Sequence, residues 1–162
     1  MPYTVASLAD LHPILQQAAL QSGQITEDPF SICVFPDTSR LINWYRWEYT
    51  PEQALLFTRD RLIHLQASAN QTVRLACIKS ANLCLASLRL ILMYGRLELV
   101  DDSHVRVVVE FNAGGYDTLQ PGFHHLLSNA CRDGSSSQSD ISSTESILDR
   151  LGEISFKFRN GL

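Results

Sequence analysis

The side chains most able to do chemistry in this chain are its five histidines and four cysteines. His124 and His125 are adjacent on a predicted helix, so their side chains point about 100° apart and do not converge on one metal ion. Cys131 follows on the same helix, but the sequence around it offers no base held in place by a third group, as an activated thiol requires. We therefore predict no catalytic residue and no metal ligand, and we expect no cofactor.

The carboxylates also fit structural roles. The aspartate pair at 101–102 suits a hairpin turn, where aspartate is a common residue. Glu98 and Glu110 lie on predicted strands and are expected to pair across the sheet with Arg96 or Arg106. These pairs are typical of the solvent-facing side of a sheet.

Aromatic and basic residues give the strongest candidate for an interaction surface. Two tryptophans and two tyrosines are crowded into residues 44–49, next to an arginine. Two interpretations stay open, because such a segment can cover a sheet as part of the core or can form a binding surface rich in hot-spot residues. The candidate interaction surface consists of Trp44, Arg46, Trp47, Arg59 and Arg61.

Composition limits the class of protein. A chain of 162 residues with 45% hydrophobic and 19% charged residues predicts one domain with a packed core. The net charge of −4 argues against nucleic-acid binding and against a polybasic membrane anchor. The apolar stretch 75–94 contains Lys79 and Arg89, which argues against a transmembrane segment.

The beginning of the chain and its cysteines bear on the compartment. Residues 1–10 lack the basic and apolar regions of a secretory signal, so we expect a cytoplasmic protein. The four cysteines are then expected to be buried free thiols, and two disulfides are the alternative that an even count leaves open.

Alternation of apolar and polar residues predicts a mostly-β chain. A short strand is expected at 30–35, and seven further strands at 54–58, 62–66, 72–79, 83–87, 88–94, 96–100 and 104–111. Gly95 is expected to end the strand at 88–94. A helix over 75–94 remains an alternative, because alanine and leucine are frequent there.

Two helices are expected outside the strands. The first spans about residues 10–22 and ends at Gly23. The second is amphipathic and spans about residues 117–130, with Asp117 or Thr118 as its N-cap and Pro121 in its first turn.

The end of the chain differs in composition from the rest. Residues 132–146 are rich in serine and are expected to form a flexible linker. Residues 147–162 regain apolar side chains, and 154–158 alternate like a strand. That strand is expected to join its own sheet or to pair with another chain.

Residues 52–130 resemble the bacterial pleckstrin-homology-like (PH-like) domains. The residues that carry the resemblance are ALLFTRDRLI at 54–63, with its Thr-x-x-Arg-Leu turn between two strands, and LMYGRLEL at 92–99, followed by a β-branched strand and a helix. The resemblance implies an α+β, mostly-β fold: a PH-like barrel or strongly bent antiparallel sheet of about seven strands, closed by a C-terminal amphipathic helix. Residues 1–131 would form this single domain, with the N-terminal helix and the aromatic segment 41–49 as an extension.

The resemblance also implies a function. PH-like domains bind phosphoinositides, peptides or partner proteins, and the lipid-binding members carry several basic residues around the loop between their first two strands. Here that loop has only Arg59 and Arg61, with Asp60 between them, which disfavours phosphoinositide binding. We expect a non-catalytic binding or adaptor module with a protein partner or self-association. The alternative is a small-molecule-binding α+β domain, or a small enzyme, with an apolar pocket between sheet and helix.

Overall fold

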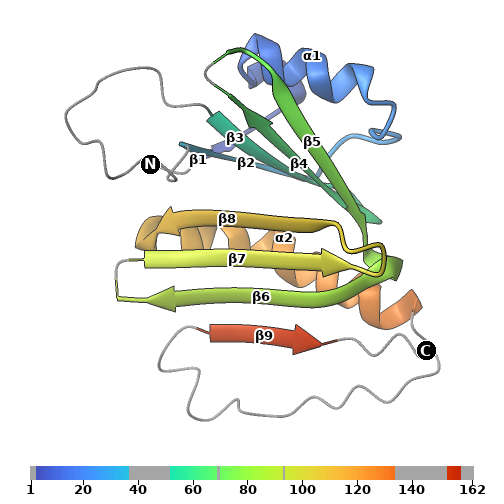
Figure 1. Cartoon of the computed structure of the whole chain (residues 1–162), viewed down its shortest axis with the longest axis vertical. Coiled ribbons are helices and arrows are strands. Elements are labelled where there is room, and N and C mark those ends of the chain that lie inside the picture. Colours follow the sequence, from blue (N-terminus) through green and yellow to red (C-terminus); the bar gives the residue numbers. More distant parts are fainter. Residues whose placement is uncertain (1–2, 37–51, 69, 93, 134–152, 158–162) are drawn as a thin grey trace.

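The computed structural model describes residues 3–36, 52–68, 70–92, 94–133 and 153–157, which form two antiparallel sheets and two α-helices (Figure 1). The strands are β1 (Tyr3–Val5), β2 (Ser31–Pro36), β3 (Glu52–Phe57), β4 (Arg61–Ala67), β5 (Val73–Lys79), β6 (Leu83–Ile91), β7 (Tyr94–Asp101), β8 (Arg106–Asn112) and β9 (Glu153–Lys157). The helices are α1 (Pro13–Gln21) and α2 (Ala113–Asp133), with short 3-10 turns at Leu8–Asp10 and Ser80–Asn82. The prediction of a mostly-β chain of the α+β class is confirmed.

The strands are divided between two sheets that do not join into a closed barrel in the described part of the chain. The first sheet has the order β1-β2-β3-β4-β5 and the second the order β8-β7-β6-β9. In Figure 1, α1 covers one face of the first sheet, and α2 lies behind the second. The alternative of a helix over 75–94 is wrong, because β5, β6 and the start of β7 occupy that stretch.

The helix α1 packs on the first sheet through one apolar stripe. Leu15 and Ala19 of α1 are fully buried at the i, i+4 spacing that places side chains on one helix face, and Leu11, just before the helix, is buried beside them. They pack against alternate residues of the sheet: Ile32, Val34, Ala54, Leu56, Ile63 and Leu65. The predicted end of this helix is confirmed, since α1 stops at Gln21 and Gly23 adopts a φ of +64°.

The main core joins three elements at once. The buried face of α2, with Leu119, Phe123 and Leu126, packs against the second sheet and against the opposite face of the first. The first sheet contributes the side chains that alternate with those facing α1: Cys33, Phe35, Leu55, Phe57, Leu62 and Ile78. Both faces of the first sheet are therefore covered at this end.

The prediction of separate strands at 83–87 and 88–94 is wrong, because residues 83–91 form the single strand β6. This stretch contains no glycine, proline, asparagine or aspartate that would favour a turn. The chain turns instead at Leu92, which adopts a φ of +57°. Gly95 lies inside β7 rather than ending a strand, and a Cβ there would overlap the ring of Phe111.

The helix α2 begins earlier than predicted. It starts at Ala113, so Asp117 and Thr118 lie inside it rather than at its N-cap, and Pro121 lies well past its first turn. Tertiary packing overrides the low helix propensity of the two glycines near its start, because the following apolar stripe is buried in the main core. The helix also continues to Asp133, into the first two residues of the predicted linker.

The two ends of the chain belong to the sheets. Strands β1 and β2 pair with each other and β2 pairs with β3, so part of the predicted N-terminal extension is integral to the first sheet. Strand β9 pairs antiparallel with β6 in its own chain over residues 153–157, as one of the two open alternatives predicted. No helix in the described ranges is long and apolar enough to cross a membrane.

The close contact of α2 with the first sheet predicts that adding a methyl group at Gly122 lowers stability. A Cβ at Gly122 would lie 2.5 Å from Cδ2 of Phe57 in the core. We expect Gly122→Ala to lower the free energy of unfolding by about 1–2 kcal/mol, because overpacking costs about 1–3 kcal/mol and the gain in helix propensity returns only ~1 kcal/mol. Urea denaturation measures this, with the exposed Gly114→Ala of the same helix as the matched control. Equal stability changes in both variants would contradict the packing.

The pairing of β9 predicts a second effect. Ending the chain at residue 133 removes β9 and leaves the backbone of β6 unpaired at residues 85–89. Because an open strand edge is a template for pairing with another chain, we expect lower stability and concentration-dependent self-association. Light scattering after size-exclusion chromatography compares the truncated and complete chains. An unchanged mass and an unchanged thermal midpoint would show that β9 does not protect this edge.

Candidate functional site

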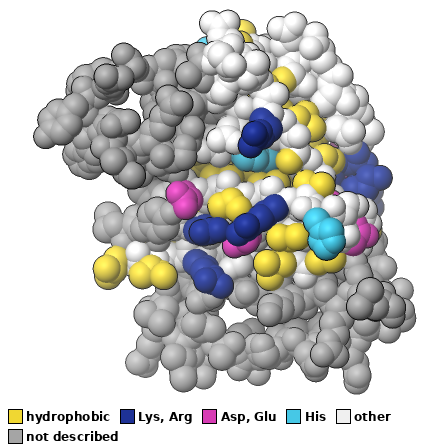
Figure 2. Space-filling model, in the orientation of Figure 1, with side chains coloured by type: hydrophobic (Ala, Val, Ile, Leu, Met, Phe, Trp, Pro, Cys, Tyr) yellow, Lys and Arg dark blue, Asp and Glu magenta, His cyan; other side chains and the backbone are white. Residues whose placement is uncertain are grey.

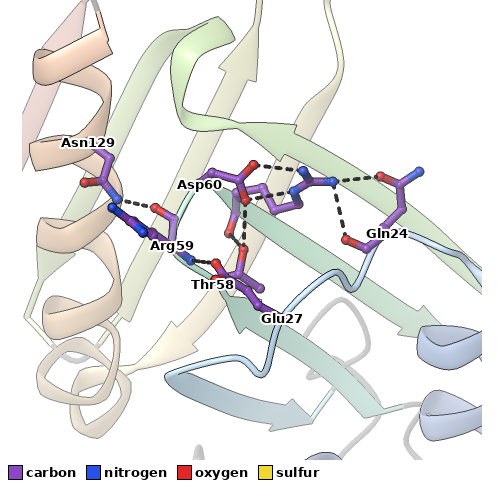
Figure 3. Close-up of polar contacts among 7 residues, drawn as sticks. Gln24, Glu27, Thr58, Arg59, Asp60 and Asn129 are labelled. Atoms are coloured by element: carbon purple, nitrogen blue, oxygen red, sulfur yellow. Dashed lines mark hydrogen bonds and ion pairs between the residues drawn. The ribbon is translucent and has the colours of Figure 1, made fainter.

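The structure describes only part of the interaction surface predicted from the sequence. Trp44, Arg46 and Trp47 lie outside the described residues, so whether the aromatic segment is core or surface stays open. Arg59 and Arg61 lie at the β3–β4 turn, which Figure 3 shows in close-up. The two arginines have different surroundings there.

The β3–β4 turn is held by contacts from two other elements (Figure 3). The backbone N–H of Arg59 donates to Oε1 of Glu27 at 2.9 Å, and its carbonyl oxygen accepts a hydrogen bond from Nδ2 of Asn129 on α2. The exposed side chain of Arg59 extends from this fixed backbone. These contacts anchor the turn to α2.

The guanidinium of Arg61 is occupied within the turn. Its Nε and Nη2 donate to the carboxylate of Asp60 at 3.0 and 2.8 Å, and Nη1 lies 3.4 Å from both acceptor oxygens of Gln24. The hydrogen bonds from Arg61 lower the pKa of Asp60. Arg61 thus has a structural explanation, and we do not place it in a binding site.

A different polar surface emerges on the first sheet. Along β4, Leu62, His64 and Gln66 alternate with the residues that face α1, and they share a face with Arg74 and Ala76 of β5. This face is apolar at the end that α2 covers and becomes polar towards Gln66, which lies opposite Arg74 in the register. The polar end is the part that α2 leaves uncovered.

The second sheet provides the opposing wall. Arg96, Glu98 and Arg106 alternate with core residues of β7 and β8, so they lie on the face directed away from α2. Oε1 of Glu98 lies 2.6 Å from Nη2 of Arg106, and Oε2 lies 3.5 Å from Nη2 of Arg96. The predicted cross-strand pairing of Glu98 is confirmed, and one carboxylate bridges two arginines.

These two walls enclose a cleft of about 310 Å³. Its lining residues come from four strands: His64, Gln66, Arg74, Ala76, Arg96, Arg106 and Val108. Figure 2 shows basic side chains gathered across the middle of this face, above and beside a band of apolar ones. The described lining contains no serine, threonine, cysteine or carboxylate that could act as a nucleophile.

His64 forms the buried floor of the cleft. Its Nε2 lies 3.1 Å from Oε1 of Gln53, and because a carbonyl oxygen only accepts, Nε2 carries the proton. Burial lowers the pKa of His64 from 6.5 to about 4, since no carboxylate compensates the desolvation of the imidazolium. At neutral pH His64 is therefore uncharged, and the positive charge of the cleft belongs to the arginines.

The three arginines make the cleft suited to anions. A guanidinium stays charged at all physiological pH values and offers five N–H donors in a planar fork. In the described structure Arg74 has no ion-pair partner, and the buried Nε of Arg96 has no hydrogen-bond acceptor. A buried donor left unpaired costs free energy, so an oxygen-rich ligand would gain from pairing with it.

The remaining histidines of α2 and the cysteines lie outside the cleft. His125 packs its ring against Phe30 with centroids 4.3 Å apart, whereas its neighbour His124 is exposed. The four cysteines are free, as predicted, but only Cys33 is buried: Cys77 and Cys84 are half-buried and Cys131, near the end of α2, is exposed. Burial raises the pKa of the Cys33 and Cys77 thiols. No group of three metal-ligating side chains comes together among the described residues.

The cleft residues carried a signal in the sequence that was missed. The alternation in 61–67 places His64 and Gln66 on the face that begins with Leu62, so one face changes from apolar to polar along a single strand. Arg96 and Arg106 were interpreted as ordinary surface residues, which their strands alone support. Their approach to Arg74 depends on the crossing of two sheets, and no local pattern encodes it.

The buried state of His64 predicts a pH dependence of stability. Because its folded pKa of about 4 lies below the unfolded value of 6.5, the unfolded chain binds the proton first as the pH falls. The free energy of unfolding therefore carries the full contribution of neutral His64 above pH 6.5. It decreases by about 1.4 kcal/mol for each unit by which the pH falls from 6.5 to about 4. We expect His64→Gln to flatten the curve of unfolding free energy against pH in this window. The exposed His124→Gln is the matched control, and identical curves for wild type and His64→Gln would disprove the assignment.

The chain was compared with known proteins by sequence and by structure. No protein-family model, no curated protein and no solved structure matches it. The function is therefore inferred from the chemistry of the cleft and the arrangement of the strands around it.

Proposed function

We propose that this chain is a non-catalytic, PH-like binding module that holds an anionic group of a partner protein in the basic cleft. The observation that carries the proposal is the convergence of Arg74, Arg96 and Arg106 from three strands of two sheets on one cleft. Like charges repel one another, so a bound anion would stabilise three guanidinium groups gathered at one cleft. Only one carboxylate, that of Glu98, pairs with them in the described structure.

The order of elements supports the PH-like part of the proposal. Four antiparallel strands, β2 to β5, are followed by the three-stranded meander β6 to β8 and then by α2. The resemblance implies seven strands within residues 52–130, where the described structure has six, β3 to β8, before α2; counting β2, which lies outside that range, gives seven. The helix α2 closes the space between the sheets, as the family's C-terminal helix does.

Binding rather than catalysis is favoured by the chemistry of the lining. Arginine, glutamine and a neutral histidine can fix the position of an anion, but the described lining has no group that would attack it. The alternative of an apolar pocket between sheet and helix has less support. Phe57 and Phe123 fill that space, where even a methyl group at Gly122 would not fit.

A protein partner is favoured over a small molecule by the strands that border the cleft. Among the described strands, β5 and β8 are the terminal strands of their sheets, and both contribute lining residues. Each therefore presents backbone N–H and C=O groups beside the arginines. An extended segment could pair with such an edge while its acidic group enters the cleft.

Titration with inorganic pyrophosphate tests the proposed cleft. We expect chemical-shift changes confined to residues of the cleft, and binding that weakens as salt is added. Arg74→Gln should reduce the affinity about tenfold, since a charge-assisted hydrogen bond contributes about 1.5–3 kcal/mol. Arg132→Gln, an exposed arginine at the end of α2, is the matched control. Equal affinities for the two variants, or shifts spread over the whole surface, would refute the proposed site.

A further inference from the structure

The carboxylate of Glu98, although not itself among the lining residues, already pairs with two of the three arginines of the cleft. It bridges Arg106 and Arg96, at 2.6 and 3.5 Å, with one oxygen directed to each. Its side chain is 23% exposed, whereas that of Arg106 is 56% exposed. Any anion that enters the cleft must therefore compete with an acceptor that the chain itself holds in place.

This competition determines which anions can bind. A single carboxylate brings the same charge and the same two oxygens as Glu98, but it must enter from solution, whereas Glu98 is already tethered beside the arginines. A carboxylate ligand thus gains little by replacing it. A phosphate monoester carries a charge of about −1.5 to −2 and three acceptor oxygens, so it can pair with more than one arginine at once.

The arginines retain unused donors for such a group. Arg74 stands on the opposite wall with no ion-pair partner in the described structure, and the buried Nε of Arg96 has no acceptor there. A ligand whose oxygens contact both Arg74 and Arg96 would span the cleft from one sheet to the other. Glu98 does not span it, because its ion pairs are confined to the second sheet. The additional donors match the additional oxygens of a phosphate.

We infer that the cleft selects a phosphate monoester over a carboxylate, that its ligand is a phosphorylated extended segment of a protein, and that Glu98 is the residue that sets this selectivity. The inference rests on the proposed function and specifies its ligand. Among the described strands, β5 and β8 are terminal in their sheets and border the cleft, which argues for a peptide as the carrier of the phosphate. Glu98 acts as an internal counter-ion that keeps weaker anions out.

The test compares three fluorescein-labelled peptides of the form Gly-Ala-Gly-X-Gly-Ala-Gly, in which X is phosphoserine, glutamate or serine. Fluorescence anisotropy with the complete chain should give the tightest binding for phosphoserine, about tenfold tighter than for glutamate, and none for serine. Glu98→Gln should strengthen binding of the glutamate peptide most and narrow the ratio between the two acidic peptides. A purely structural role of Glu98 would weaken both.

Asp117→Asn is the matched control, because it removes the same charge from an exposed position on α2, away from the arginines of the cleft. An equal gain in both variants would show a general charge effect and overturn the role of Glu98. An unchanged ratio in Glu98→Gln would do the same.

Further measurements separate the source of the phosphate from the proposed function itself. Inorganic phosphate that binds as tightly as the phosphoserine peptide, or binding to phosphatidylinositol-phosphate vesicles but not to the peptide, would overturn the peptide as ligand. Binding of pyrophosphate in the cleft without any preference for phosphoserine would overturn the inference and leave the proposed function standing. Failure of pyrophosphate itself to bind would refute both.

Discussion

The packing of α2 against both sheets is the constraint on which the rest of the structure depends. Phe123 and its apolar neighbours on α2 contact the second sheet and also the face of the first sheet that carries Phe57 and Leu62. This single core fixes how the two sheets cross. Because α2 covers only one end of that face, the other end, with Gln66 and Arg74, is left to meet the outer side of β7 and β8. The cleft lies where the apolar packing of α2 between the two sheets ends.

The transition from core to cleft occurs within single strands. Along β4 the same face carries Leu62, which is fully buried, then His64, which is buried with a hydrogen bond to Gln53, and then the half-buried Gln66. A buried imidazole has a low pKa and remains neutral, so it can form the floor of the site without adding charge to the core. The charged groups stand further out, where water and Glu98 moderate their repulsion.

Elements with strong local signals could be predicted from the sequence, whereas the site could not. The hairpin of β3 and β4 follows from two β-rich runs around a short polar turn, and the expected order of the later strands agrees with the structure except for the split of β6. The turn at Leu92 was missed because a leucine with positive φ carries no turn signature. Arg74 and Arg106 are 32 positions apart in the sequence and belong to different sheets. Each alone looks like an ordinary strand residue facing water, and only the crossing of the sheets makes them neighbours.

The polar end of the first sheet also has a cost in stability. The positions of Gln53, His64 and Arg74 continue the same faces as Leu55, Leu62 and Ile78, so apolar side chains there would extend the core towards the second sheet. Such a core would bury more apolar area and would leave no unpaired guanidinium N–H. A chain selected for stability alone would be expected to fill the cleft in this way. Three arginines and one bridging carboxylate stand there instead, as the proposed anion-binding role would require.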